Sequence, residues 1–67
     1  MDMRQRILLV DDEPELRRMV ASLLTGAGYE VAEAADCAQA RAAMAARRPD
    51  AVLLDVMLPD GDGFSLL

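Results

Sequence analysis

The chain has 67 residues and a formal net charge of −5, with seven arginines and no lysine. A chain of this length forms one small domain, which buries only about 60% of the surface that it exposes when unfolded. Twelve of the apolar residues are alanines and only one Phe, one Tyr and no Trp are present, so we expect a marginal core. The negative charge argues against a nucleic-acid interface.

The lack of a membrane or signal segment and the single cysteine exclude further classes of protein. No apolar stretch approaches the ~20 residues that cross a bilayer, and no signal-peptide pattern is present, so we expect no membrane contact and, by default, a cytoplasmic location. Cys37 is the single cysteine and the chain has no His, which excludes an internal disulfide and a Cys/His zinc site. We interpret Cys37 as an ordinary helix residue.

Two short apolar runs end at aspartate. Residues 7–10 (Ile-Leu-Leu-Val) precede Asp11 and Asp12, and residues 51–54 (Ala-Val-Leu-Leu) precede Asp55. Neither run alternates with polar residues, which is typical of a strand covered on both faces in a parallel sheet wrapped by helices. We therefore predict strands over 7–11 and 51–55 and an α/β fold.

The segment after the first strand predicts a helix and then a weaker strand. Pro14 suits the first helical turn, where its missing N–H has no partner to lose. Apolar residues then recur at helical spacing and form one amphipathic face: Leu16, Met19, Val20, Leu23 and Leu24. Gly28 is the expected stop. Residues 29–34 read as a strand near a sheet edge.

A second helix is expected over about 36–47, with Asp36 as its N-cap. Its apolar side is thin and consists of Ala40, Ala43 and Met44. After the third strand, the Pro, Asp and Gly content predicts a loop over 58–63, followed by one turn of a third helix over 64–67. No repeat or linker marks an internal boundary, so residues 1–67 are treated as one domain.

This element order predicts where the aspartates meet. Right-handed crossovers in a β-α-β-α-β chain make the first and third strands parallel, either adjacent or close, with their carboxyl ends at the same edge of the sheet. Neighbouring strands lie about 4.8 Å apart, so Asp11, Asp12 and Asp55 would converge there. Three carboxylates at one place repel one another unless a hard divalent cation lies between them. Mg²⁺ is the natural candidate, at the edge where open α/β sheets bind ligands.

The residues that carry this pattern resemble the receiver domain of bacterial two-component response regulators. The similar segments are Leu-Val-Asp-Asp-Glu-Pro at 9–14, Gly-Tyr-Glu-Val at 28–31 and Pro-Asp-Ala-Val-Leu-Leu-Asp-Val-Met-Leu-Pro-Asp-Gly-Asp-Gly at 49–63. The spacing of Asp55, Pro59 and Gly63 is the most specific part. The resemblance implies a flavodoxin-like parallel sheet with helices on both faces, here a partial receiver over 1–67 that stops at the start of a third helix.

The resemblance also implies roles for particular residues. By position, Asp55 would be the phosphoacceptor, and Asp11, Asp12 and Asp55 would supply carboxylates to Mg²⁺, with the backbone carbonyl of Met57 as a further ligand. The Asp55 carboxylate would attack a phosphoryl group and become an aspartyl phosphate. The implied partners are a sensor histidine kinase or phosphotransfer protein, and an output domain in a longer parent chain. Receivers promote their own phosphorylation and dephosphorylation without being conventional enzymes.

Simpler interpretations exist for each aspartate. Asp12 could merely cap the helix that begins at Pro14, and Asp55 could merely begin a turn. Their joint occurrence at the ends of two apolar strands favours the site. The string Asp60-Gly61-Asp62-Gly63 shares part of a calcium-loop pattern, but the required first acidic position falls on Leu58, so we interpret it as a loop and helix cap.

Departures from the family keep alternatives open, because this chain supplies roughly the first half of a receiver. The family's Thr or Ser, its Lys and its switching aromatic residue have no counterpart, and Arg41 occupies a usually apolar helix position. The main alternative is an interaction or dimerisation module that works without phosphorylation. A metal-dependent hydrolase is a third interpretation, which the lack of an identifiable general acid disfavours. The third strand would leave an open edge that invites pairing. A fragment of a longer receiver is favoured, then a homodimer through this edge, then an incompletely ordered chain.

Overall fold

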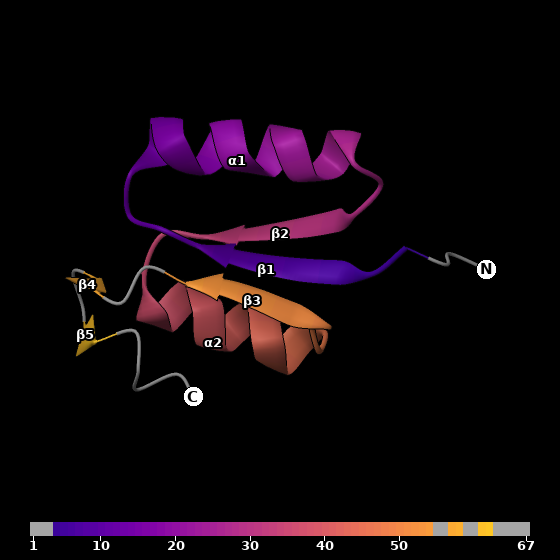
Figure 1. Cartoon of the computed structure of the whole chain (residues 1–67). Coiled ribbons are helices and arrows are strands. Elements are labelled where there is room, and N and C mark those ends of the chain that lie inside the picture. The colour runs from indigo at the N-terminus through magenta and orange to yellow at the C-terminus, as the bar shows by residue number, and fades with distance from the viewer. Residues whose placement is uncertain (1–3, 55–56, 59–60, 63–67) are drawn as a thin grey trace.

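A parallel three-stranded sheet lies between two helices (Figure 1). The computed structural model of the chain describes residues 4–54, 57–58 and 61–62. Its main elements are β1 (Arg6–Val10), α1 (Pro14–Gly26), β2 (Glu30–Ala34), α2 (Cys37–Ala46) and β3 (Ala51–Leu54). The strand order is β2-β1-β3, and both pairings are parallel. The predicted α/β fold is confirmed, and β2 lies at a sheet edge as expected.

The core is built around β1, the central strand. Ile7, Leu8, Leu9 and Val10 are all buried, because β1 has a neighbouring strand on both sides and a helix layer on both faces. Leu8 and Val10 pack in one cluster with Ala34 of β2 and with Cys37 and Ala40 of α2. The prediction of a strand covered on both faces is confirmed for β1, which ends one residue before Asp11.

The same prediction is wrong for β3. Ala51 and Leu53 are exposed, and Leu53 retains 42% of its accessible surface. In the part of the chain that the structure describes, β3 pairs only with β1. The α1 contacts with the sheet fall mainly on β2 and β1, so within the described residues α1 gives β3 little cover.

Helix α1 begins at Pro14, as predicted, and its C-terminus is closed by backbone hydrogen bonds. The Gly28 N–H donates to the Thr25 carbonyl at 3.0 Å, and Gly28 has a φ of 99°, a left-handed conformation that favours glycine. The predicted apolar face is only partly covered. Leu16, Met19 and Leu23 are 43%, 56% and 68% exposed, and the buried residue of the helix is Ala21.

Helix α2 follows its predicted pattern closely. The Gln39 N–H donates to Oδ1 of Asp36 at 2.7 Å, which confirms the N-cap. Ala40 is fully buried, and Ala43 and Met44 pack against the core. Cys37 is the first residue of this helix and is buried. These small side chains let α2 approach the sheet closely.

The segment after β3 differs from the predicted loop. Residues Met57–Leu58 (β4) and Gly61–Asp62 (β5) pair as a short antiparallel ladder. The loop prediction over 58–63 is therefore wrong at Leu58, Gly61 and Asp62, because turn-forming residues also bring two flanking segments close enough to pair. The predicted helical turn over 64–67 lies outside the described residues. None of the described helices is long and apolar enough to cross a membrane.

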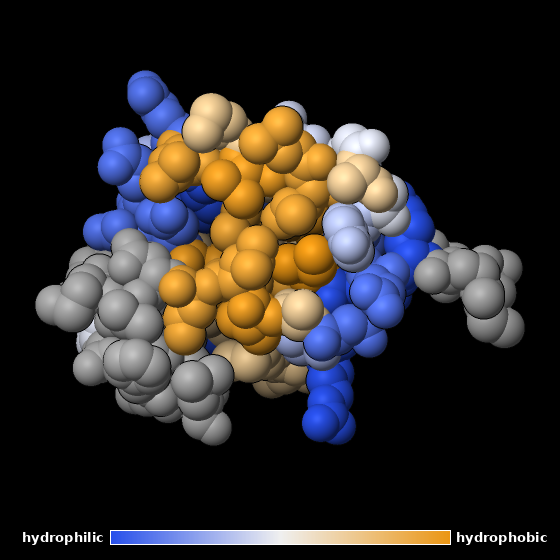
Figure 2. All heavy atoms as spheres, in the orientation of Figure 1, coloured by the Kyte–Doolittle hydropathy of each residue, from blue (hydrophilic) through white to orange (hydrophobic). Residues whose placement is uncertain are grey.

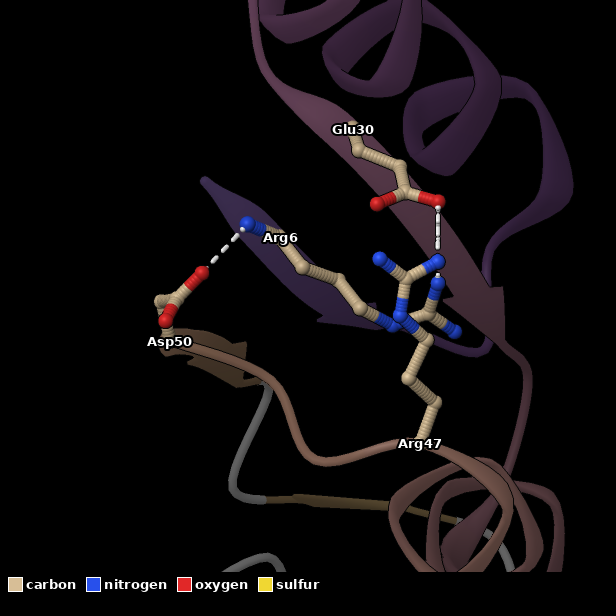
Figure 3. Close-up of polar contacts among 4 residues, drawn as sticks. All are labelled: Arg6, Glu30, Arg47 and Asp50. Atoms are coloured by element: carbon tan, nitrogen blue, oxygen red, sulfur yellow. Dashed lines mark hydrogen bonds and ion pairs between the residues drawn. The ribbon is translucent and has the colours of Figure 1, made fainter. Parts of the chain in front are cut away.

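Polar contacts tie together the amino ends of the three strands (Figure 3). The Glu30 Oε1 atom accepts from Arg6 at 3.3 Å and from Arg47 at 2.8 Å. The Arg6 N–H donates to Asp50 Oδ2 at 2.7 Å. One end of the sheet is thus fixed by ion pairs, and the opposite end carries Asp11.

Candidate phosphoacceptor and metal site

Strand pairing brings the carboxyl ends of β1 and β3 to the same edge of the sheet. β1 and β3 are adjacent and parallel, and Val10 pairs with Leu54 in their register. Asp11 follows Val10 directly, and Asp55 follows Leu54 directly in the sequence. Asp55 itself lies outside the described residues. The predicted parallel arrangement is confirmed, with the two strands adjacent, and the convergence of the carboxylates stays a prediction.

Asp11 is fixed by hydrogen bonds on both its backbone and its side chain. Its N–H donates to the Ala34 carbonyl at 3.0 Å, which continues the contact with β2 beyond the end of β1. Its Oδ1 accepts from the Glu13 N–H at 2.9 Å. Its carbonyl accepts from Arg17 at 2.9 Å. The half-buried Asp11 therefore holds its carboxylate in a set orientation before any ligand arrives.

Asp12 lies in the turn between β1 and α1 and is exposed to solvent. The residue at the N-cap position is Glu13, which makes no side-chain cap bond. The simpler interpretation of Asp12 as the cap of α1 is therefore wrong, and its carboxylate is not committed to that helix. This observation removes the main competing role for Asp12.

Met57 lies in β4 and pairs with Asp62 of β5. The role of its carbonyl as a metal ligand is untested and stays a prediction. Within residues 4–54, 57–58 and 61–62, no group of three His, Cys, Asp or Glu residues is placed to hold a metal ion. The predicted metal site includes Asp55, which is outside these ranges.

An open hollow of about 320 Å³ lies beside Asp11. Its lining comes from β1, α1 and β3 and consists of Leu9, Val10, Asp11, Val20, Leu53 and Leu54. Figure 2 shows apolar side chains gathered over α1 and the neighbouring part of the sheet. Asp11 thus lies at the border of an apolar surface.

Sequence reasoning missed Arg17, which joins three parts of this edge. Besides its bond to the Asp11 carbonyl, its Nε donates to Glu33 Oε1 at 3.1 Å. The helical spacing places Arg17 on a different face from Leu16, but this spacing alone does not specify a contact with the preceding turn. Its position three residues after Pro14, within the first helical turn, was the available signal.

Oxygen donors at this edge suit Mg²⁺. A hard cation of this size is bound through a few carboxylates and retained waters. Asp11 and Asp12 are adjacent carboxylates with no cap role, and Asp11 is already oriented. The described part of the site therefore fits the ion that the sequence predicts.

Comparisons with known proteins agree with this arrangement. The family model for the response regulator receiver domain matches residues 7–67. The DNA-binding response regulator MtrA of Mycolicibacterium smegmatis is 48% identical over 64 residues, which cover 96% of this chain and 28% of MtrA. The phosphate regulon transcriptional regulatory protein PhoB of Pseudomonas aeruginosa is 50% identical over 60 residues, covering 90% of this chain and 26% of PhoB.

A solved structure supports the same relationship. The chemotaxis response regulator CheY4 of Vibrio cholerae superposes with a TM-score of 0.91 at 39% identity, covering 96% of this chain and 53% of CheY4. The chain thus spans about half the length of this structural neighbour and about a quarter of the two regulators. With the fold, the strand-end aspartate and the family match in agreement, the chain belongs to the response regulator receiver domain family.

Proposed function

We propose that this chain is a phosphoacceptor module of a two-component signalling system. Asp55 accepts the phosphoryl group, and Asp11, Asp12, Asp55 and the Met57 carbonyl hold Mg²⁺. The observation that carries the proposal is the register of β1 and β3, in which Val10 pairs with Leu54 immediately before the two aspartate positions. The phosphoryl donor in the cell is a sensor histidine kinase or a phosphotransfer protein.

The chemistry is a phosphoryl transfer to a carboxylate. One oxygen of Asp55 forms a bond to phosphorus while the bond from phosphorus to the leaving group breaks, and the leaving group takes the electron pair. With acetyl phosphate as donor, acetate leaves. Mg²⁺, when bound, supplies neutralisation of the negative charge on the phosphoryl oxygens. Asp11, whose carboxylate is held by the Glu13 N–H, would supply an oriented oxygen ligand to that cation.

Intact-protein mass spectrometry after incubation with acetyl phosphate tests the proposal. We expect a phosphoryl adduct that needs Mg²⁺, that disappears with a chelator and that is absent from Asp55→Asn. The matched control is Asp50→Asn, because Asp50 lies at the opposite end of the sheet and Asn keeps an acceptor for the Arg6 N–H. An adduct that persists in Asp55→Asn, or no adduct on folded wild-type chain, would contradict the proposal.

A second function is favoured by one observation, the exposed apolar face of α1. Leu16, Met19 and Leu23 are each more than two-fifths exposed, and Leu53 of β3 lies open as well. Exposed apolar patches of this kind mark interaction surfaces. In the described part of the chain, β3 also pairs on one side only, so an interaction module that joins a second copy through this edge is the alternative.

Light scattering separates the two functions. A dimer whose formation does not change with acetyl phosphate or Mg²⁺ would favour the interaction module. A compact monomer that gains a phosphoryl group would favour the phosphoacceptor and exclude the dimer. Leu53→Lys places a charge beside the open edge of β3. We expect this variant to dissociate a dimer that uses this strand.

A further inference from the structure

Arg17, in the first turn of α1, contacts the residue that follows β1 and a residue of β2. Both contacts lie at the edge of the sheet that carries Asp11. Its guanidinium donates to the Asp11 carbonyl at 2.9 Å and to Glu33 Oε1 on β2 at 3.1 Å. The side chain of Arg17 is only 14% exposed, whereas that of Glu33 is 39% exposed. Arg17 is thus a largely covered cation that reaches back over the turn in which the two aspartates lie.

The bond to the Asp11 carbonyl has a geometric consequence for both aspartates. The carbonyl of Asp11 and the N–H of Asp12 belong to one planar peptide unit. A donor that holds this carbonyl therefore restricts ψ of Asp11 and φ of Asp12, the two dihedral angles between the side chains. The Asp11 N–H is already held by Ala34. With both sides of Asp11 held, the backbone that joins the two aspartate side chains is restrained.

A purely structural role is the competing explanation. Arg17 and Glu33 form an ion pair, but pairs that are exposed to solvent contribute little to stability. Glu33 is exposed, so this pair by itself does not explain the burial of Arg17. A bond from a charged donor to a backbone carbonyl is stronger than a neutral one. Of these two side-chain bonds of Arg17, the one to the Asp11 carbonyl is therefore the one that we expect to matter for function.

We propose that Arg17 is a positioning residue for the Mg²⁺ carboxylates, with Glu33 orienting its guanidinium. This inference rests on the proposed function, because it concerns the same metal site. Arg17 acts through the peptide between Asp11 and Asp12 and does not contact the ion. Loss of a partner that orients a metal ligand commonly weakens metal binding by about 10-fold to 100-fold. Because this edge is partly open to solvent, we expect the lower value.

The test is a Mg²⁺ titration of the whole chain followed by amide chemical shifts, with a second measurement of phosphorylation by acetyl phosphate. Arg17→Gln should raise the half-saturating Mg²⁺ concentration about tenfold. At saturating Mg²⁺, its phosphorylation rate should return close to that of the wild type. Arg17→Lys, which keeps one donor and the charge, should recover part of the affinity. Arg18→Gln is the matched control, since Arg18 is the neighbouring exposed arginine, and should leave the titration unchanged.

Glu33→Gln keeps the bond from Arg17 to Asp11 but removes the negative charge that orients the guanidinium. This variant should therefore raise the half-saturating Mg²⁺ concentration less than Arg17→Gln does. This variant keeps the inference testable if Arg17→Gln does not fold. Equal Mg²⁺ affinities in the wild type, Arg17→Gln and Glu33→Gln would overturn the inference, as would an equal loss in Arg18→Gln. Failure of the wild type to bind Mg²⁺ would overturn the inference and the metal site together. Mg²⁺ binding without phosphorylation would contradict only the phosphoacceptor function.

Discussion

Leu8 is the residue whose truncation should cost this fold most. It is 1% exposed, lies in the middle of the central strand and packs in the cluster with Val10, Ala34, Cys37 and Ala40. Leu8→Ala removes buried carbon atoms and leaves a cavity, which costs about 2–5 kcal/mol in protein cores. Strands on both sides of β1 prevent the site from collapsing, so we expect at least about 3 kcal/mol.

This loss is large compared with the whole stability of the domain. At about 0.05–0.15 kcal/mol per residue, a chain of this length has about 3–10 kcal/mol of folding free energy. Urea unfolding followed by circular dichroism measures the change. With a slope of about 1 kcal/mol per molar for a small domain, the midpoint should fall by about 3 M or the transition should vanish.

The matched control is the same substitution on the exposed face of α1. Leu23 is 68% exposed, and alanine is a better helix former than leucine, so Leu23→Ala should change stability by no more than about 0.5 kcal/mol. Equal destabilisation by Leu8→Ala and Leu23→Ala would refute this reasoning. It would mean that the face of α1 is covered in solution, for example by a second copy.

Three further predictions concern local chemistry. Asp36→Ala should destabilise the chain by about 1 kcal/mol through loss of the α2 cap, whereas Asp36→Asn, which keeps the acceptor, should cost little in the same urea assay. Gly28→Ala should destabilise the chain by about 1 kcal/mol, because Gly28 has a φ of 99°. Gly26→Ala should stabilise it, because Gly26 also has open space around it but lies at the helical end of α1. A change of the same sign in both variants would contradict this reasoning. Arg47→Gln should lower the thermal midpoint only slightly, since its ion pair with Glu30 is partly exposed, and added salt should reduce the difference from wild type.

The elements that local chemistry determines could be predicted from the sequence. Pro14 and Asp36 mark helix starts because a missing N–H and a side-chain acceptor act within one turn. The continuous apolar run of β1 also predicted its burial correctly, whereas the equally continuous run of β3 did not. The exposure of Leu53 and of the α1 face was not readable, because it depends on which elements cover them and not on the residues themselves.

The candidate site divides in the same way. The position of Asp11 at a strand end followed from the apolar run before it, and the parallel direction of β1 and β3 followed from the crossover rule. The contact between Arg17 and the Asp11 carbonyl depends on the rotation of α1 about its axis, which periodicity fixes only to within a face. The roles of Asp55 and Met57 remain predictions that the phosphorylation experiment tests.

The central position of β1 in the sheet also has a consequence for folding during synthesis on the ribosome. Of the three strands, the one that is synthesised first needs partners on both edges, and Arg6 meets Asp50 across 44 positions of sequence. Until β3 emerges, one edge of the most apolar strand has no neighbour. Such long-range pairing slows folding and exposes a nascent strand to other chains. The interval after β1 has emerged from the ribosome and before β3 has emerged is therefore the one in which this polypeptide is most exposed to pairing with other chains.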